Sequence, residues 1–222
     1  MSRSAAPRSD RVGAAEIVRL AAPMGSRLRI GIDGPGGSGK SRLAAELARC
    51  WPTAATLVHG DVFGRPTTDP ARSEQRIGGL FDLSRLEREV LEPHERGGPI
   101  RYRRYDWDAD RLGAWITAPH DGTLIVEGIY TTHPSIRDRY HFLIWVDADR
   151  PTRLARGLAR DGESARSRWE DIWMPVEDRY RDEHRPDDAA HLVLDSTDTT
   201  DGAELTFRVD AQSISDQSSV WI

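Results

Sequence analysis

Eight consecutive residues, Gly34 to Ser41, carry the clearest chemical pattern in this chain. Their sequence, GPGGSGKS, matches the phosphate-binding pattern G-x-x-x-x-G-K-[ST] at every position. Glycines allow successive backbone N–H groups to turn around a phosphate, and the start of the following helix adds a favourable dipole. We expect the side chain of Lys40 to reach the β- and γ-phosphates of ATP and the hydroxyl of Ser41 to ligate Mg²⁺. The residues expected to contact the nucleotide are Gly34, Gly36, Gly37, Ser38, Gly39, Lys40, Ser41 and Arg42.

Lys40 is the only lysine in the chain. The sequence holds 31 basic residues, and the other 30 are arginine. A compact ammonium group passes through a tight loop in which the planar guanidinium is too bulky. The single lysine therefore indicates a position at which the size and shape of the side chain matter as well as its charge. It also excludes the guanine-reading N-K-x-D motif of GTPases.

Four acidic residues follow apolar runs that are typical of buried strands: Asp33, Asp61, Glu127 and Asp147. The carboxyl ends of parallel strands meet at one edge of a sheet, so we expect these acids to lie near the glycine-rich turn. Asp61 would orient and deprotonate an attacking hydroxyl or hold the metal, and Glu127 would hold Mg²⁺ or water. The candidate metal ligands are thus Ser41, Asp61 and Glu127.

Several arginines lie downstream of these acids at helical spacing. Arg156 and Arg160 share one helix face, and Arg166 and Arg168 follow a short break. We expect residues 156–175, approximately, to form an arginine-rich helical lid. Arg156, Arg160 and Arg166 would neutralise charge on the transferring phosphoryl group while the lid excludes water.

The order of the predicted elements indicates an α/β protein. Strands alternate with helices, which predicts a three-layer fold of the P-loop nucleoside triphosphate hydrolase type with a mainly parallel, five-stranded sheet. The expected strands are 28–33, 54–60, 123–128, 141–149 and 191–195. The expected helices are 14–22, 40–51, 82–94, 150–161 and 167–184, and residues 99–115 should become helical toward their end.

We expect three parts along the chain. Residues 1–27 form an N-terminal segment with a short helix, and residues 28–198 form the main domain. Residues 199–222 form a C-terminal strand or tail, with 203–210 as a possible strand.

Composition restricts the partners of the protein. Its net charge of −5 and isoelectric point of about 5.8 argue against nucleic-acid binding. Cys50 is the only cysteine, which excludes an intrachain disulfide and favours a reducing compartment. No apolar run is long enough for a membrane span or a secretion signal. We expect a cytoplasmic protein that binds a small molecule and possibly forms a homo-oligomer.

Five segments, in order over residues 28–195, resemble P-loop kinases of the uridine kinase and phosphoribulokinase type: GIDGPGGSGKS, HGDVFG, RYDWDADR, LIVEGIY and DADRPTRLARGLARD. The resemblance implies transfer of a phosphoryl group from ATP to a hydroxyl group, with Mg²⁺. It implies that Asp61 is the catalytic base with Phe63 beside it, and that Tyr105 and Asp106 lie near the acceptor. Glu127 is expected to face the substrate as well as the metal.

On the acceptor side the sequence departs from the uridine kinase pattern. The segment after Tyr105 and Asp106 lacks the histidine that uridine kinases usually carry there, and RIGGLFD replaces an acidic stretch. A uridine- or cytidine-like nucleoside is the first expectation. A sugar phosphate, a pantothenate-like compound or a specialised metabolite is the second. A nucleotide-binding regulatory protein with little phosphoryl transfer remains a third reading.

Overall fold

Short apolar runs form the centre of the sheet in the computed structural model, which describes residues 11–199 and 206–209. The central strands are β2 (Arg29–Asp33), β6 (Thr123–Glu127) and β7 (Phe142–Asp147), and nearly all of their residues are buried. Such continuous burial occurs when both faces of a parallel strand are covered. β3 (Ala55–His59) and β8 (Leu192–Asp195) extend the parallel sheet on either side.

The sheet has seven strands rather than the five that the sequence predicted, in the order β1-β9-β8-β7-β2-β6-β3. The five expected strands are present and parallel. The two others are β9 (Thr206–Val209), antiparallel to β8, and β1 (Arg11–Gly13), antiparallel to β9. β9 falls within the further strand that the sequence suggested. β1 has only three residues, so it is too short to show a period and is defined by its distant partner.

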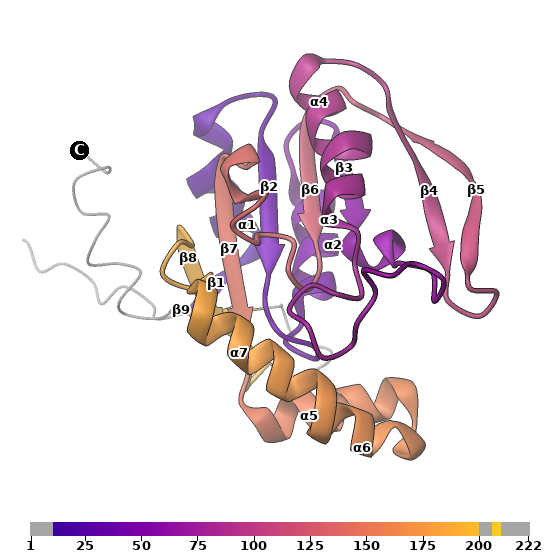
Figure 1. The fold of residues 1–222 in the computed structure, drawn as a ribbon. Helices are drawn as coiled ribbons and strands as arrows, with labels where there is room; N and C mark the ends of the chain where they lie inside the picture. The colour runs from indigo at the N-terminus through magenta and orange to yellow at the C-terminus, as the bar shows by residue number, and fades with distance from the viewer. Residues whose placement is uncertain (1–10, 200–205, 210–222) are drawn as a thin grey trace, which may run out of the picture.

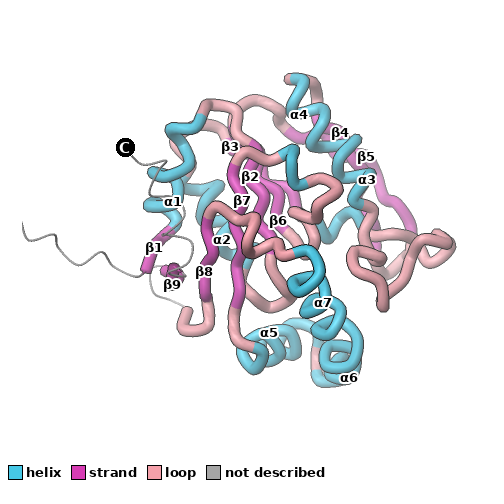
Figure 2. Tube along the Cα trace, turned by 60° about the vertical axis from the view of Figure 1, so that its left-hand side comes forward, coloured by secondary structure: helices cyan, strands magenta, loops and turns pink. Residues whose placement is uncertain are grey.

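Helices cover both faces of the sheet, as Figure 2 shows. One layer consists of α1 (Ala14–Ala21) and α2 (Lys40–Cys50), whose apolar faces pack with Ile30, Ile32 and Ile125 in one core. The other layer is a helix from Leu83 to Arg96, which packs with Leu124 and Val126 on the opposite face. Successive residues of a strand point to opposite faces, so each strand supplies both cores. The three-layer α/β fold is therefore as predicted.

The helix from Leu83 to Arg96 and the lid share a local irregularity. In each, five residues adopt the wider π-helical turn: η3 (Glu87–Leu91) and η6 (Trp169–Trp173). A proline follows each turn closely, at positions 93 and 175. Proline has no N–H to donate and its ring crowds the preceding turn, so the helix widens there instead of ending.

Residues 100–118 form a β-hairpin, and the prediction of a helix toward residue 115 was wrong. β4 (Ile100–Asp106) and β5 (Arg111–Ala118) pair antiparallel and project from the sheet in Figure 1. Tyr102 and Tyr105 of β4 are buried while Arg101 and Arg104 are exposed. Ile100 and Tyr102 follow the strand period of two, but the register shifts between Arg103 and Tyr105, so the next buried residue comes three positions later and the period is broken in the sequence.

The lid is a pair of helices below the carboxyl ends of the strands in Figure 1. α5 (Arg150–Asp161) ends at Gly162, and η5 (Glu163–Ala165) leads into a second helical run. That run comprises α6 (Arg166–Arg168), η6 and α7 (Met174–His184), which returns to the sheet. The expected helices at 150–161 and 167–184 are thus present. Two short 3-10 turns, η1 (Ala22–Met24) and η4 (Arg137–Arg139), lie elsewhere.

Within the described ranges, no helix is both long and apolar enough to cross a membrane.

A histidine contact next to α7 should make the stability of the fold sensitive to acid. The ring centroid of His133 lies 6.1 Å from that of Tyr180 and 4.9 Å from that of His184. Burial, with the nearby charges of His184 and Arg137, lowers the pKa of His133 to about 4. In the unfolded chain the same group titrates near about 6.5. As the pH falls between these values the unfolded state takes up a proton that the folded state does not, so stability is lost.

We therefore expect His133→Gln to lose less free energy of unfolding than the wild type when the pH is lowered from 7 to 5. Urea unfolding at both pH values measures this difference, and an NMR titration of His133 measures its pKa directly. His120→Gln, on a loop outside this contact, serves as the control and should keep the wild-type pH dependence. An equal loss in the His133 variant would contradict the assignment.

Candidate active site

The turn from Gly34 to Gly39 connects β2 to α2, as the motif requires. Gly37 and Gly39 have φ values of +76° and +90°, in the left-handed region that favours glycine. Lys40 is buried, and its ammonium group donates to the carbonyl oxygen of Pro35 at 2.8 Å. The buried hydroxyl of Ser38 has no hydrogen-bond partner among the described residues. A loop of glycines with a buried cation and an unsatisfied hydroxyl fits the terminal phosphates of a nucleotide.

Gly37 also lies against the backbone of α5. A Cβ atom at this position would come within 2.5 Å of the carbonyl oxygen of Arg153, in addition to the positive φ. We expect Gly37→Ala to lower the free energy of unfolding by about 2 to 3 kcal/mol, because both the contact and the backbone conformation are strained.

Denaturant unfolding measures that loss. Gly98→Ala is the matched control, since its Cβ would find only an ordinary contact at 3.7 Å and no positive φ. A Gly37 variant as stable as the Gly98 variant would show that the turn does not need this conformation.

Glu127 lies at the floor of the site, where β6 ends, and is almost fully buried. One carboxylate oxygen accepts a hydrogen bond from the Ser41 hydroxyl at 3.0 Å, and the other lies 2.6 Å from Nδ1 of His59. Burial alone would raise the pKa of Glu127, but the hydrogen bond with His59 and the charge of Lys40 outweigh it and lower the pKa. Glu127 is therefore a carboxylate at neutral pH, directly beside the helix start that carries Ser41.

His59 is a functional candidate that the sequence reasoning missed. It is the last residue of β3 and lies directly across from Glu127 in the parallel register. The hydrogen bond with Glu127 raises the pKa of His59 despite partial burial. The signal in the sequence was available, because both residues end apolar runs that the sheet topology places side by side.

Asp61 follows β3 at the start of η2 (Gly60–Phe63), and its side chain opens into the pocket. Protein atoms nonetheless surround it closely enough to raise its pKa, and the Glu127 carboxylate acts in the same direction. The charges of Lys40 and Arg160 oppose this shift. Asp61 is thus a partly desolvated carboxylate between the P-loop and the lid.

The other two predicted edge acids do not face this site. Asp33 is fully buried and holds the loop after β6 and α7 through hydrogen bonds. Asp147 pairs with Arg181 of α7 at 2.6 Å. Two of the four acids therefore line the pocket and two serve the surrounding structure.

The arginines of the lid differ in whether their side chains line the pocket. Arg156 lines the pocket and donates to the carbonyl oxygen of Gly37 at 3.2 Å and to the Ser196 hydroxyl at 2.9 Å. Arg160 lines it too, paired with Asp161 and lying 5.8 Å from the ring centre of Trp169.

Arg166 pairs with Glu163 and Glu170 on the exposed side of the lid and does not line the pocket. Arg168 does line the pocket and lies 3.6 Å from Glu74.

The lid is anchored on the P-loop through a buried ion pair. Glu177 of α7 accepts hydrogen bonds from the backbone N–H of Gly36 at 3.1 Å and from Arg153 at 2.7 Å. Burial raises the pKa of Glu177, although Arg153 opposes this. Trp169 packs against Gly36 and Gly157, where a side chain would clash. These contacts fix the second lid helix against the phosphate turn.

The predicted acceptor residues lie behind the pocket wall. Phe63 is fully buried and packs on Tyr102 and under Arg85. Tyr105 is buried and its hydroxyl group donates to Asp110. The carboxylate of Asp106 accepts from the backbone N–H groups of residues 108 and 109 in the hairpin turn.

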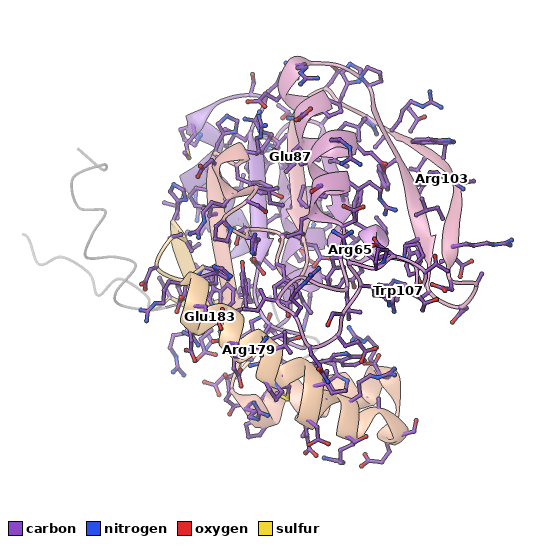
Figure 3. All side chains as sticks on the ribbon, in the orientation of Figure 1. Arg65, Glu87, Arg103, Trp107, Arg179 and Glu183 are labelled. Carbon is purple, nitrogen blue, oxygen red and sulfur yellow. The ribbon has the colours of Figure 1, made fainter. Side chains whose placement is uncertain are left out.

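Trp107, the next residue along, does line the pocket, and its indole N–H donates to the carbonyl oxygen of Asp61 at 3.1 Å. In Figure 3 it lies at the lower end of the hairpin, toward the lid.

These elements enclose a pocket of about 930 Å³. Its wall opposite the P-loop comes from the loop 64–82 (Thr67, Arg72, Glu74, Arg76, Leu80 and Phe81), from Trp107 and from residues 129–130. We name the part lined by the P-loop and α5 the nucleotide half and the part lined by the loop 64–82 and Trp107 the acceptor half, for the roles proposed below; Asp61 lines the same pocket. A second hollow, at the β4–β5 hairpin, is lined by Arg103 and residues 111–114, but Arg103 is bonded there to backbone carbonyl groups.

Among the described residues, no cluster of three or more His, Cys, Asp or Glu side chains forms a metal site. The donors at hand are a hydroxyl from Ser41 and carboxylates from Asp61 and Glu127. Oxygen donors in small number suit Mg²⁺, which keeps several waters and takes further ligands from phosphates. The chemistry of these donors thus fits the expected ion.

Comparison with known proteins shows the family of the chain. A family model described as the phosphoribulokinase / uridine kinase family matches residues 80–200. The chain belongs to this family. A curated uridine kinase from Brevibacillus brevis (strain 47 / JCM 6285 / NBRC 100599) is 26% identical over 147 residues, which covers 63% of this chain and 69% of the relative.

Two solved structures show the same fold. A possible uridine kinase from Bacillus stearothermophilus superposes with a TM-score of 0.61 at 19% identity, covering 81% of this chain and 96% of the other. A candidate fructose transport system kinase from Silicibacter sp. TM1040 gives 0.62 at 17% identity, covering 78% and 95%. Family membership makes this protein a small-molecule kinase with a nucleotide-binding P-loop.

Proposed function

We propose that this protein transfers the γ-phosphoryl group of ATP, with Mg²⁺, to a hydroxyl group of a small molecule in the cytoplasm. The observation that carries the proposal is the position of Asp61. Its carboxylate opens into a single pocket between Lys40 of the P-loop and the wall formed by the loop 64–82. A base placed between a phosphate site and a second site suits transfer to an acceptor.

In this reaction Asp61 takes the proton of the acceptor hydroxyl as its oxygen attacks the γ-phosphorus. The bond between the γ-phosphorus and the bridging oxygen breaks, and ADP leaves. The raised pKa of Asp61 makes it a better proton acceptor at working pH than an ordinary carboxylate. Phosphoryl transfer needs little covalent help from the protein, so positioning and charge neutralisation carry most of the rate.

The other residues have roles in binding and orientation. The backbone of Gly34, Gly36, Gly37 and Gly39, with Ser38, would hold the phosphates, and Arg42 lines the nucleotide half. Ser41 and Glu127, with Asp61, would hold Mg²⁺, which supplies neutralisation of phosphate charge when bound. His59 would orient Glu127 through their hydrogen bond.

The lid would complete the site. Arg160 lies close enough to influence Asp61 and would stabilise charge on the transferring group. Arg156 would support the P-loop from behind. Arg166 would reach the site only after the lid moves. Phe63, Tyr105 and Asp106 would shape the acceptor wall behind Trp107.

An assay of ADP formation with purified protein tests the proposal. Uridine and cytidine are the first acceptors to examine, followed by sugars and sugar phosphates. We expect release of ADP that depends on the acceptor, with Lys40→Ala as the blank. Slow release that is the same with every acceptor, together with tight nucleotide binding, would instead favour a regulatory protein.

A further inference from the structure

The acceptor half of the pocket contains two arginines without an ion-pair partner. Arg72 and Arg76, both from the loop 64–82, line the pocket, and neither has a carboxylate of the described residues within ion-pair distance. Arg65 of the same loop is different, because it pairs with Asp69 at 2.8 Å and lies 3.6 Å from Asp82. The loop thus neutralises one arginine internally and presents two others to the pocket.

Arg72 is held in a defined position. Its guanidinium group donates to the carbonyl oxygen of Arg65 and, at 3.4 Å, to the hydroxyl of Tyr105. Its Cζ lies 5.5 Å from the ring centre of Trp107. The Trp107 indole in turn donates to the backbone of Asp61 at 3.1 Å. A short chain of contacts therefore connects Arg72 to the residue that would receive the acceptor proton.

The cations of the nucleotide half lie elsewhere. Lys40 and Arg160, from the P-loop helix and α5, line the pocket, and Arg156 of α5 lines it while donating to the P-loop carbonyl of Gly37. Arg168 is balanced by Glu74. Arg72 and Arg76, on the acceptor side of Asp61, form no direct ion pair among the described residues; Asp110 and Asp69 act on them only at longer range.

From this arrangement we propose that the acceptor carries a phosphate or carboxylate group in addition to its reactive hydroxyl, and that Arg72 and Arg76 bind this anionic group. The inference rests on the proposed kinase function. A planar guanidinium can bind either anion through two parallel hydrogen bonds. Beside these arginines the Phe81 ring contacts the rings of Trp107 and Tyr130, with both pairs of centroids 6.1 Å apart.

The physical reason concerns desolvation. A neutral acceptor that filled this half would remove water from Arg72 without giving its charge a direct ion-pair partner, which costs free energy. An anionic acceptor replaces that water with a charge-assisted hydrogen bond. Because its contacts already fix the Arg72 side chain, little side-chain freedom is lost on binding.

Matched ligand pairs test the proposal. Protein loaded with Mg²⁺ and a non-hydrolysable ATP analogue is titrated by calorimetry with D-ribose and D-ribose 5-phosphate, and with D-glucose and D-gluconate. Uridine serves as a neutral aromatic ligand. We expect the anionic member of at least one pair to bind about 10-fold tighter than its neutral partner and than uridine, as one charge-assisted contact allows.

Three variants identify the residues responsible. Arg72→Gln and Arg76→Gln should each reduce the preference for the anion, Arg72→Gln to within about 2-fold, with unchanged affinity for the ATP analogue. Arg88→Gln, an exposed arginine outside the pocket, is the control and should keep the preference.

Equal or tighter binding of the neutral ligands would overturn the inference. So would failure of every anionic ligand to bind, or a loss of ATP-analogue affinity in Arg72→Gln with the anion preference intact. In these cases the kinase proposal survives. Failure of the wild type to bind the ATP analogue would instead overturn the proposed function, and the inference with it.

Discussion

Asp61→Asn is expected to lower kcat by about 1,000-fold while the affinity for ATP changes by less than about 3-fold. The asparagine is close in size to aspartate and keeps the polar contacts of the pocket wall. It cannot accept the proton of the acceptor hydroxyl, so the loss should fall on the chemical step. Steady-state kinetics with a saturating acceptor, together with a separate nucleotide titration, measure both quantities.

Asp138→Asn is the matched control, because Asp138 is an exposed acid on η4, outside the pocket. It should retain full activity. An Asp61 variant with near-normal kcat would show that another group, or no protein group, accepts the proton. A variant that lost ATP affinity in proportion to its loss of rate would show that Asp61 acts mainly as a ligand of the Mg–nucleotide complex and not as the proton acceptor.

Asp33→Ala is expected to lower the free energy of unfolding by about 4 kcal/mol, the largest stability effect that we predict. The Asp33 carboxylate is fully buried and accepts hydrogen bonds from three backbone N–H groups, at Gly34, Tyr130 and Thr132. It also accepts from the hydroxyl groups of Thr132 and Tyr180, each at 2.8 Å. Removing it leaves five buried donors without an acceptor.

Urea unfolding followed by circular dichroism measures this loss. Asp147→Ala tests the same sheet edge at a neighbouring strand, where the carboxylate pairs with a half-exposed arginine. There we expect a loss of at most about 1 kcal/mol, because such ion pairs contribute little. Similar losses in the two variants would mean that the buried hydrogen bonds of Asp33 do not hold the fold together.

Asp33 and Asp147 illustrate that the sequence predicted the location of the acids at the sheet edge but not their roles. The sequence placed Asp33, Asp61, Glu127 and Asp147 together at the ends of strands, and each of them does end or follow a strand of the sheet. It could not separate their roles. Whether a carboxylate faces a pocket or a ring of hydrogen-bond donors depends on loops and helices that approach from elsewhere in the chain.

Sequence patterns correctly predicted those elements whose residues interact mainly with residues close to them in the sequence. The P-loop, α2 and α5 have local hydrogen bonds and amphipathic spacing, so their sequences alone indicated them. The hairpin at residues 100–118 was misread because a register shift between Arg103 and Tyr105 interrupts the strand period of two. β1 was missed because its three residues acquire a strand conformation only by pairing with β9, almost two hundred positions away.

The sequence by itself therefore determined the phosphate-binding turn, the three-layer α/β fold and the identity of the acids at the sheet edge. Only the tertiary structure decided which of those acids line a pocket, that His59 hydrogen-bonds with Glu127, and that Trp107, Arg72 and Arg76 line the same pocket. The physical reason is how far apart in the sequence the interacting residues lie. The motif of a P-loop lies within eight residues, whereas the rest of the pocket combines a loop, a hairpin and a lid that only folding brings together.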